Sequence, residues 1–222
     1  MSIKKIPEST ISRLFVYLRE LSELSKLNIR TISSSELGER VNLNDAQVRK
    51  DLGYFGQFGI SGSGYDINEL KAALEKILGK DKTWNVAVIG AGHLGSALIT
   101  YPGFQQHGLN VVTAFDADVK KIGKRFGGIT IQPAGELPKA VKEKKIAIGI
   151  IAVPAKDAQE VANSLVKSGV ECILNFAPTV LSVPENVKVN NVDLSRALET
   201  FSYFLVNPAL SGRVNKAVSG KK

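Results

Sequence analysis

The sequence predicts an α/β protein of two domains, a small helical domain followed by one built on a mostly parallel sheet. Two observations lead to this division. Before a glycine and several charges at residues 79–84, apolar residues recur at helical spacing. After them, short β-branched runs alternate with amphipathic segments, which is the pattern of repeated βαβ units. We therefore expect domains over residues 1–80 and 81–194, and a separate terminal segment over residues 195–222.

The first domain is expected to contain helices and a glycine-rich hairpin. The helices are predicted over residues 9–26, 34–41, 45–56 and 67–78. Ser9 or Thr10 is expected to cap the first of them, and Asn44 or Asp45 the third. A tight turn joins the second and third helices, as in a helix-turn-helix motif. Glycines then alternate with β-prone residues, which is typical of the hairpin, or wing, of a winged helix.

The second domain begins with a strand, three spaced glycines and a helix. Residues 86–89 predict a buried strand, and Gly90, Gly92 and Gly95 follow in the G-x-G-x-x-G spacing of dinucleotide-binding turns. The first glycine permits a tight turn, the second admits a pyrophosphate, and the third lets the helix pack on the strand. The phosphates are then expected at the amino end of the helix. The predicted contact loop is Gly90, Ala91, Gly92, His93, Leu94 and Gly95.

An acidic residue ends the next predicted strand. Residues 111–115 are apolar and lead to Asp116, about 20 residues past the last glycine, where an acid hydrogen-bonds a ribose diol and repels a 2′-phosphate. Asp118 is a rival for this role, and Lys120 or Lys121 has the charge to tolerate a 2′-phosphate. We prefer Asp116 because it lies at the strand end, and we therefore expect NAD rather than NADP.

The remaining pattern predicts a Rossmann fold, a doubly wound parallel sheet. Strands are predicted over residues 85–89, 110–115, 128–132, 146–153, 170–176 and 187–192, and helices over residues 94–101, 135–143, 155–168 and 196–206. Ligands of such sheets bind at the carboxyl ends of the strands. Two turns at those ends are therefore expected to line the cofactor, and they comprise Ala152, Val153, Pro154, Asn175, Phe176 and Ala177.

The composition is that of an ordinary soluble protein. Of the 222 residues, 44% are hydrophobic and 23% are charged, and no apolar run is long enough to cross a membrane. The one cysteine, Cys172, lies in an apolar run, where we expect it to be buried. A single cysteine forms neither an internal disulfide nor a zinc-ligand pattern, so we expect a cytoplasmic protein without a metal site.

The third helix of the first domain is the basis of a DNA-binding hypothesis. The net charge of +8 is not, because residues 1–80 hold 12 Lys/Arg and 10 Asp/Glu, a net of only +2. On the third helix Gln47, Arg49 and Lys50 cannot all share the inward face with Val48. Arginine reads guanine edges, glutamine reads adenine and lysine holds phosphates, although such charges are more often only a solvated surface.

Six segments of the chain resemble the Rex family of redox-sensing transcriptional repressors. They are PESTISRLFVYLREL, QVRKDLGYFGQFG, GSGY, GAGHLGSAL, AVPAKDAQ and ILNFAP, and the resemblance extends to about Asn207. Membership implies a winged-helix domain joined to a Rossmann domain, in a homodimer that binds double-stranded, inverted-repeat operator DNA. It also implies that NADH releases the DNA, with NAD⁺ competing for the same site.

The resemblance assigns DNA-binding residues by motif. Arg49 and Lys50 fall on the recognition helix, with Gln47 and Tyr54 beside them. The wing corresponds to Ser61, Gly62, Ser63 and Gly64. Its tip lacks the basic residue that the family often has there, which weakens the case for a minor-groove contact.

The resemblance also implies a redox switch and an exchanged terminal helix. In the switch, Asp193 exchanges partners between Tyr101 and Arg19 as the cofactor changes. Taken singly, the three residues have ordinary interpretations as a helix cap, a packed helix end and a surface arginine. The terminal helix has an apolar stripe of Leu198, Phe201, Phe204 and Leu205. The family implies a domain-swapped position in the partner subunit, whereas the stripe alone is typical of packing within its own subunit.

An enzymatic role is not expected. Only about 30 residues follow the last strand, too few for the second domain that positions a substrate in dehydrogenases. His93 in the glycine loop and His107 in the next turn are poorly placed for acid/base catalysis. Two alternatives stay open: an NAD- or CoA-binding oxidoreductase or ligase-type subunit with an accessory helical domain, and a DNA-binding protein with a vestigial nucleotide site.

Overall fold

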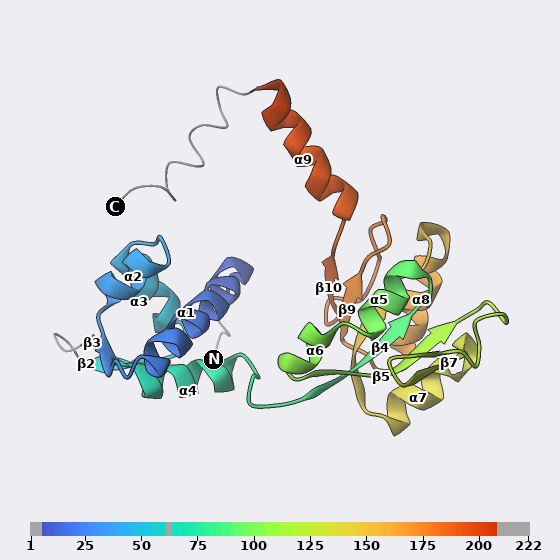
Figure 1. Cartoon of the computed structure of the whole chain (residues 1–222), viewed down its shortest axis with the longest axis horizontal. Helices are drawn as coiled ribbons and strands as arrows, with labels where there is room; N and C mark the ends of the chain where they lie inside the picture. The colour runs from blue at the N-terminus through green and yellow to red at the C-terminus, as the bar shows by residue number, and fades with distance from the viewer. Residues whose placement is uncertain (1–5, 61–63, 208–222) are drawn as a thin grey trace. The chain divides into compact units, whose positions relative to one another are not determined.

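The computed structural model describes residues 6–60 and 64–207 of the chain. The chain divides into two compact units, which we call the N-terminal unit, Met1–Lys82, and the C-terminal unit, Thr83–Lys222. Figure 1 labels the helices and strands of both. Each unit buries a hydrophobic core of its own.

The N-terminal unit is a winged helix, as predicted. Its elements are α1 (Glu8–Lys26), β1 (Thr31–Ile32), α2 (Ser34–Arg40), α3 (Asp45–Gly53), β2 (Gly59–Ile60), β3 (Gly64–Asp66) and α4 (Ile67–Ile77). The three short strands form an antiparallel sheet in the order β1-β3-β2. Helices α2 and α3 pack on each other across the tight turn, which is the arrangement of a helix-turn-helix motif.

The caps of the first and third helices differ. Asn44 caps α3 as predicted, because its side chain accepts a hydrogen bond from a backbone N–H of the first turn. The prediction that Ser9 or Thr10 caps α1 is wrong. The residue before α1 is Pro7, whose extended backbone starts the helix without a side-chain cap. Thr10 lies inside the helix and is buried, and its hydroxyl is committed to Asp51 instead.

Apolar side chains from all four helices form the core of the N-terminal unit. Along α1 and α4 they recur at intervals of three and four residues, so each helix buries one stripe. The fully or almost fully buried members include Leu14, Leu21, Leu37, Val48, Leu52, Ile67, Leu70 and Leu74.

The C-terminal unit is a Rossmann fold, as predicted. Its strands are β4 (Trp84–Ile89), β5 (Leu109–Asp116), β6 (Arg125–Phe126), β7 (Ile129–Pro133), β8 (Ile146–Ile151), β9 (Cys172–Asn175) and β10 (Lys188–Asn191). The sheet order is β10-β9-β8-β4-β5-β7-β6, and every pair is parallel except β6 with β7. The chain reverses its winding direction between β4 and β8, which is the switch point where such sheets bind ligands.

The helices of this unit are α5 (His93–Ile99), α6 (Pro102–Gln106), α7 (Leu137–Glu143), α8 (Ala155–Lys167) and α9 (Leu194–Val206), and a 3₁₀ turn, Ala134–Glu136, precedes α7. The helix predicted over residues 94–101 ends early, and a second helix follows it. Pro102 is the cause, because it has no N–H to continue α5 and it holds Tyr101 in an extended backbone conformation, with φ −70° and ψ 112°.

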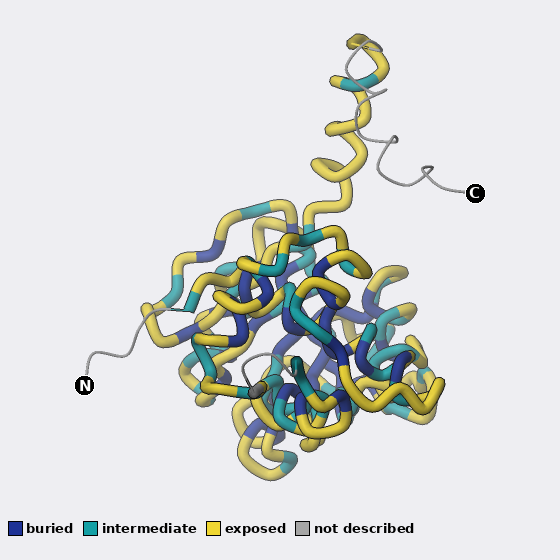
Figure 2. The backbone as a smooth tube through the Cα atoms, turned by 90° about the vertical axis from the view of Figure 1, so that its left-hand side faces the viewer, coloured by how far each residue is buried: buried dark blue, intermediate teal, exposed yellow. Residues whose placement is uncertain are grey.

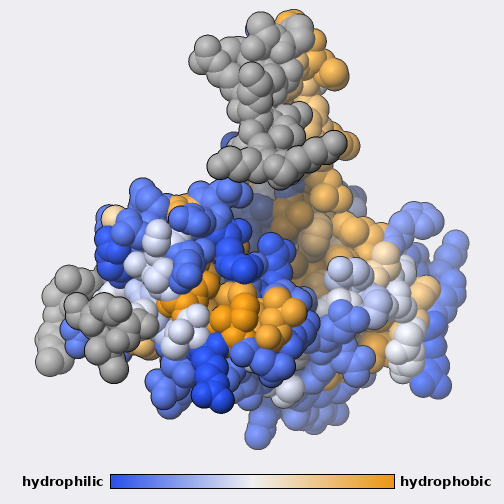
Figure 3. Space-filling model, turned by 60° about the vertical axis from the view of Figure 1, so that its left-hand side comes forward, coloured by the Kyte–Doolittle hydropathy of each residue, from blue (hydrophilic) through white to orange (hydrophobic). Residues whose placement is uncertain are grey.

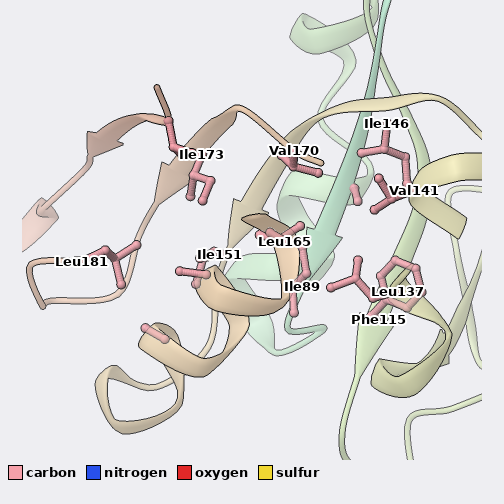
Figure 4. Packing of buried hydrophobic residues seen from close by; sticks show 14 of the residues in the cluster. Ile89, Phe115, Leu137, Val141, Ile146, Ile151, Leu165, Val170, Ile173 and Leu181 are labelled. Atoms are coloured by element: carbon pink, nitrogen blue, oxygen red, sulfur yellow. The ribbon is translucent and has the colours of Figure 1, made fainter. Parts of the chain in front are cut away.

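The sheet buries apolar side chains on both faces. Along β4, Ala87 and Ile89 belong to one cluster and Val86 and Val88 to another, because successive side chains of a strand point to opposite faces. In the first cluster, Leu165 of α8 meets side chains of β4, β8 and α7 (Figure 4). In the second, α5 covers the other face of the sheet. The core therefore holds the carboxyl ends of β4, β5, β8 and β9 in fixed register.

The prediction that Cys172 is buried is wrong. The residue is exposed, because it is the first residue of β9 and lies where the chain enters the sheet. Helix α9 buries none of its residues either (Figure 2). Its apolar side chains Leu198, Phe201 and Leu205 are 68%, 60% and 81% exposed, and Figure 3 shows apolar residues along this helix. Within residues 6–60 and 64–207, no helix has the length and apolar character needed to cross a membrane.

Candidate functional site

The glycine loop between β4 and α5 is held by close backbone packing. Gly90 has φ +98°, a conformation that L side chains rarely adopt, and a Cβ there would lie 2.5 Å from the carbonyl oxygen of Ala152. A Cβ on Gly95 would overlap the carbonyl oxygen of Gly90. The first and third glycines of the motif therefore bring the helix, the strand and the turn after β8 together, as expected from the spacing.

Gly92 serves a different purpose from the other two glycines of the motif, Gly90 and Gly95. A Cβ built on Gly92 meets no atom within 4 Å, so packing of the protein does not explain the absence of a side chain. Gly92 is the residue before α5, and the first turn of that helix has no side-chain cap. His93 and Leu94, which begin the helix, are exposed. The loop thus leaves open space in front of backbone N–H groups, which fits the approach of a phosphate.

Asp116 lies at the carboxyl end of β5 and is tied to this loop. Its Oδ2 accepts a hydrogen bond from the Ala91 N–H (2.8 Å), and its Oδ1 accepts one from the Asp118 N–H (2.8 Å). Lys121 Nζ lies 3.0 Å from Oδ2. Burial by itself raises the pKa of Asp116, but the hydrogen bonds from Asp118, Lys121 and Ala91 outweigh it and hold the pKa below its usual range. The carboxylate is therefore charged at neutral pH.

The rival residues near Asp116 have other surroundings. Asp118 lies beyond the strand and is exposed, and its Oδ1 accepts the N–H of Lys120. Lys121 pairs with Asp116 itself, and sequence reasoning considered this lysine only as a partner for a 2′-phosphate. The spacing of five residues across a turn was the one available indication of the ion pair.

The two predicted turns lie beside the glycine loop. Strand β8 lies between β4 and β9 in the sheet, and Ala152 donates its N–H to the carbonyl oxygen of Ile89 (2.8 Å). The N–H of Phe176 likewise donates to Ile151 (2.9 Å). Val153 lies close to Gly90, and Pro154 is exposed. The structure therefore brings together the ends of three neighbouring strands.

Asn175 shapes its turn from the inside. It is fully buried, and its Nδ2 donates to oxygens of Ala177 (3.2 Å), Thr179 (2.9 Å) and Asn191 (2.8 Å). Its Oδ1 accepts the Ala177 N–H at 3.0 Å. The side chain of Asn175 is thus committed to the protein, and it holds Phe176 and Ala177 in place.

The recognition helix of the helix-turn-helix motif is α3. Arg49 and Lys50 are exposed on it. The guanidinium of Arg49 donates to Asp45 (2.6 Å) and to Ser34 Oγ of α2 (3.0 Å), so it is held at the surface near the start of the helix. Tyr54 follows the last turn and is half-buried.

The sequence did not indicate the surroundings of Gln47. Its Nε2 donates to Asp51 Oδ1 (2.8 Å), inside the unit, rather than pointing outward with Arg49. Asp51 is fully buried. The available indication was the position of Asp51, which lies three residues after Val48 and therefore on the inward face of α3.

Of the predicted wing, one residue is described. Gly64 begins β3 with φ +75°, and a Cβ there would lie 2.6 Å from the carbonyl oxygen of Ile32, so glycine is required by the fold. Ser61, Gly62 and Ser63 lie outside the described residues.

The three predicted switch residues occupy exposed positions. Arg19 lies on α1 of the N-terminal unit. Tyr101 lies between α5 and α6, is 56% exposed, and packs edge-on against Phe104 with ring centroids 5.1 Å apart. Asp193 caps α9, because its Oδ1 accepts the Arg196 N–H at 3.0 Å. The cap interpretation of Asp193 is therefore correct, and it leaves Oδ2 for another partner.

Two family models match the chain. The family described as "Putative DNA-binding protein N-terminus" matches residues 5–53, and the family described as "CoA binding domain" matches residues 81–179. A winged helix joined to a Rossmann unit with a glycine loop and an acidic strand end defines a class of protein, the transcriptional regulators that carry a nucleotide-binding unit.

Known relatives narrow this class to one family. The redox-sensing transcriptional repressor Rex of Desulforamulus reducens is 49% identical over 205 residues, which are 92% of this chain and 98% of the relative. That of Carboxydothermus hydrogenoformans is 52% identical over 199 residues, 90% of this chain and 96% of the relative. The chain belongs to the Rex family of redox-sensing transcriptional repressors.

Solved structures agree with this assignment. RSP, a Rex-family repressor, in complex with β-NAD⁺ and operator DNA matches with a TM-score of 0.88 at 38% identity, covering 97% of this chain and all of RSP. RSP in complex with β-NADH matches with a TM-score of 0.79 at 37% identity, covering 95% of this chain and 98% of RSP.

Proposed function

We propose that this chain is a redox-sensing repressor that binds inverted-repeat operator DNA as a homodimer and is released when NADH occupies the C-terminal unit, with NAD⁺ competing. The observation that carries the proposal is the Asp116 carboxylate, held charged at the strand end by hydrogen bonds from Asp118, Lys121 and Ala91 of the glycine loop. A charged acid there selects an unphosphorylated ribose. The likeness to RSP over 97% of the chain, in a complex with both β-NAD⁺ and operator DNA, supports the same pairing here.

The cofactor is assigned two groups of contacts. The loop and strand end contribute Gly90, Ala91, Gly92, His93, Leu94, Gly95 and Asp116. The turns after β8 and β9 contribute Ala152, Val153, Pro154, Phe176 and Ala177 as contacts, and Asn175 as the residue that supports the second turn. The open space at Gly92 fits the phosphates, and the Asp116 carboxylate fits a ribose hydroxyl. The buried Asn175 acts by holding the second turn rather than by touching the cofactor.

Operator contacts are assigned to the N-terminal unit. Arg49 and Lys50 lie exposed on α3, where arginine reads guanine in the major groove and lysine neutralises phosphates. Gln47 and Tyr54 lie beside them. The wing is assigned to Ser61, Gly62, Ser63 and Gly64. Without a basic residue at its tip, its share of the affinity is expected to be small.

Release of DNA requires that the cofactor bind the DNA-free form more tightly. NADH and NAD⁺ differ by one positive charge on the nicotinamide, and a carboxylate or an apolar wall near that ring can separate them. A coupling of about 1–3 kcal/mol between the two sites changes DNA affinity roughly 5- to 150-fold. We assign the switch to Asp193, which exchanges between Tyr101 and Arg19.

Domain roles follow from this proposal. Residues 1–80 form the DNA-binding domain, residues 81–194 the NAD(H)-binding domain, and residues 195–222 the dimerisation segment. The exposed apolar side chains of α9 support an exchange of this helix into the partner subunit, because such a stripe is costly to leave in water. The cofactor acts as a ligand and undergoes no reaction, and the protein works on DNA in the cytoplasm.

One titration tests the proposal. Fluorescence anisotropy of a labelled inverted-repeat duplex, selected by the full-length protein from a randomised pool, is measured with NADH, NAD⁺ or both. NADH is expected to release the duplex, and NAD⁺ to reduce that effect. DNA binding that neither cofactor alters would instead indicate a vestigial nucleotide site. Turnover of NAD⁺ with a substrate, without an effect on DNA, would indicate an enzyme subunit.

A CoA-binding subunit is the second candidate, because the "CoA binding domain" family matches residues 81–179. It predicts that CoA binds the C-terminal unit more tightly than NADH does. Isothermal titration with CoA and NADH on the same preparation separates the two candidates. CoA binding at least as tight as that of NADH would favour the alternative.

A further inference from the structure

A buried carboxylate joins α1 to α3 in the N-terminal unit. Asp51 is fully buried, and Arg13 contacts it with two nitrogens, Nε at 2.5 Å from Oδ2 and Nη2 at 2.7 Å from Oδ1. Tyr17 Oη donates to Oδ2 (2.8 Å), and Thr10 Oγ1 donates to Oδ1 (3.1 Å). Three side chains of α1 therefore converge on one carboxylate of α3.

The cluster resists separation of the two helices. Thr10, Arg13 and Tyr17 are three and four residues apart, so they share one face of α1. Burial raises the pKa of Asp51, but hydrogen bonds, first that from Arg13, outweigh it and hold the pKa below its usual range. Pulling α3 away from α1 would remove the three α1 side chains that neutralise and solvate this charge. The cluster therefore opposes a change in the angle between the two helices.

Gln47 is the remaining member of the cluster. Its Nε2 donates to Asp51 Oδ1 (2.8 Å) from one turn earlier on α3. A glutamine that reads adenine presents both its amide nitrogen and its amide oxygen to the base. Here one N–H of that nitrogen is used by Asp51, and Gln47 is less exposed than Arg49 and Lys50 on the same helix.

We propose that Asp51 and Gln47 are positioning residues for operator recognition: Asp51 holds α3 against α1, Gln47 orients the Asp51 carboxylate, and together they fix the angle at which Arg49 and Lys50 meet the DNA. This inference rests on the proposed function. It assigns Gln47 a role inside the protein in place of base reading. Helix α1 also carries Arg19, one of the proposed switch residues. A displacement of α1 would therefore move the recognition helix α3 with it.

The test uses two variants that each remove one hydrogen bond and leave the buried charge otherwise paired. Tyr17→Phe removes the phenolic donor, and Gln47→Ala removes the amide donor. Ser12→Ala is the matched control, because the Ser12 hydroxyl bonds to the Glu8 carbonyl on the same helix and does not touch Asp51. Anisotropy is measured with the full-length protein on the selected duplex and on all its single-base-pair variants. Circular dichroism checks that each variant is folded.

The proposal predicts uniform and non-additive losses. Tyr17→Phe and Gln47→Ala each weaken binding to every duplex by one common factor, roughly 3- to 10-fold, and the double variant is little weaker than the stronger single one. Ser12→Ala binds as the unchanged protein does.

Three results would overturn it. A Gln47→Ala loss confined to one base pair would make this residue a base reader. If the losses in affinity from the two substitutions multiply in the double variant, the two residues do not act through Asp51. If neither substitution changes the affinity, the positioning role is wrong. If the unchanged protein selects no duplex, the proposed function itself fails.

Discussion

The backbone N–H of Ala91 donates to the Oδ2 of Asp116 across 2.8 Å, although 25 residues separate the two in the chain. The bond joins the loop that would hold the pyrophosphate to the residue that would hold the ribose. A dinucleotide presents these two groups at a fixed spacing. A site that binds both therefore gains affinity when its own two contacts are held rigidly at the matching distance. The Asp118 N–H on Oδ1 completes the orientation of the carboxylate.

Replacing the acid should separate the two functions of the chain. Asp116→Ala is expected to weaken NADH binding about 10- to 100-fold, the effect of losing a hydrogen bond to a charged group. Operator binding without cofactor should stay nearly unchanged, because Asp116 lies in the C-terminal unit. Calorimetry and anisotropy measure the two effects. The control is Asp118→Ala, which removes an exposed carboxylate two residues away. Equal losses of NADH and DNA binding would contradict the assignment.

Gly92 and Gly95 should differ when each is replaced by alanine. The new Cβ of Gly92→Ala enters open space, so the melting temperature should hardly change, while NADH binding should be lost because the methyl group occupies the phosphate approach. The Cβ of Gly95→Ala meets the Gly90 carbonyl, so this variant should be destabilised by about 1–3 kcal/mol. Differential scanning fluorimetry with and without NADH measures both effects. Tight NADH binding by a stable Gly92→Ala variant would rule out the proposed phosphate position.

The local frame of the nucleotide site was predictable because one short motif specifies it. Strand, glycines, helix and acidic strand end must follow in that order, and each occupies the expected place in the structure. Short elements were not predictable in the same way. The two-residue strand β1 exists only by pairing with β3, and the break at Pro102 divides one expected helix into two.

The Asp51 cluster shows a second limit of sequence reasoning. A serine or threonine near a helix start is usually a cap, so Ser9 or Thr10 was expected in that role. The structure instead uses Thr10 as a donor to a residue 41 positions away. Nothing in the spacing of α1 indicates that its polar residues Thr10 and Arg13 share a partner on α3. Gln47 points inward to the same carboxylate from one turn earlier on α3, whereas Arg49 and Lys50 are exposed, so part of the set points outward as helix geometry predicted.

Removing the recognition arginine should impair DNA binding and leave cofactor binding intact, the reverse of what is expected for Asp116. Arg49→Ala is expected to weaken operator binding by about 1–3 kcal/mol and to relax the preference at one base pair, because arginine reads a guanine with two hydrogen bonds. NADH binding should not change. Arg40→Ala is the control, since Arg40 is exposed on α2 and pairs with Glu20. A uniform loss across all single-base-pair variants would make Arg49 a phosphate contact instead.

The stripe on α9 should govern the oligomeric state. Leu198→Ser with Phe201→Ser removes two apolar side chains that are 68% and 60% exposed in the single chain. If α9 packs against a second copy, light scattering should show a shift from dimer to monomer, with loss of binding to the two half-sites. Glu199→Ser on the same helix should stay dimeric. A dimer that persists in the double variant would place the interface elsewhere.

The buried Asp51 should make the protein sensitive to acid. An aspartate in the unfolded chain has a pKa of about 4. The pKa of Asp51 in the folded protein lies below this value, so the stability that its charge contributes to the fold is fully present above about pH 4. It is lost as the pH falls through the folded pKa, because protonation then favours the unfolded chain. Among the partners of Asp51, Arg13 and Tyr17 keep their charge states over this range, so the change belongs to the aspartate.

The comparison of the unchanged protein with Asp51→Asn isolates this effect. At pH 7 the variant should be less stable by about 3–5 kcal/mol, the cost of breaking a buried ion pair from one side. As the pH falls below about 4, the difference between the two stabilities should shrink progressively, because protonation of Asp51 removes the stabilisation that the variant lacks at every pH. Urea unfolding of the full chain between pH 7 and pH 3, followed by circular dichroism, gives the difference at each pH. A difference that stays constant over the whole range would show that the carboxylate does not stabilise the folded state through its charge.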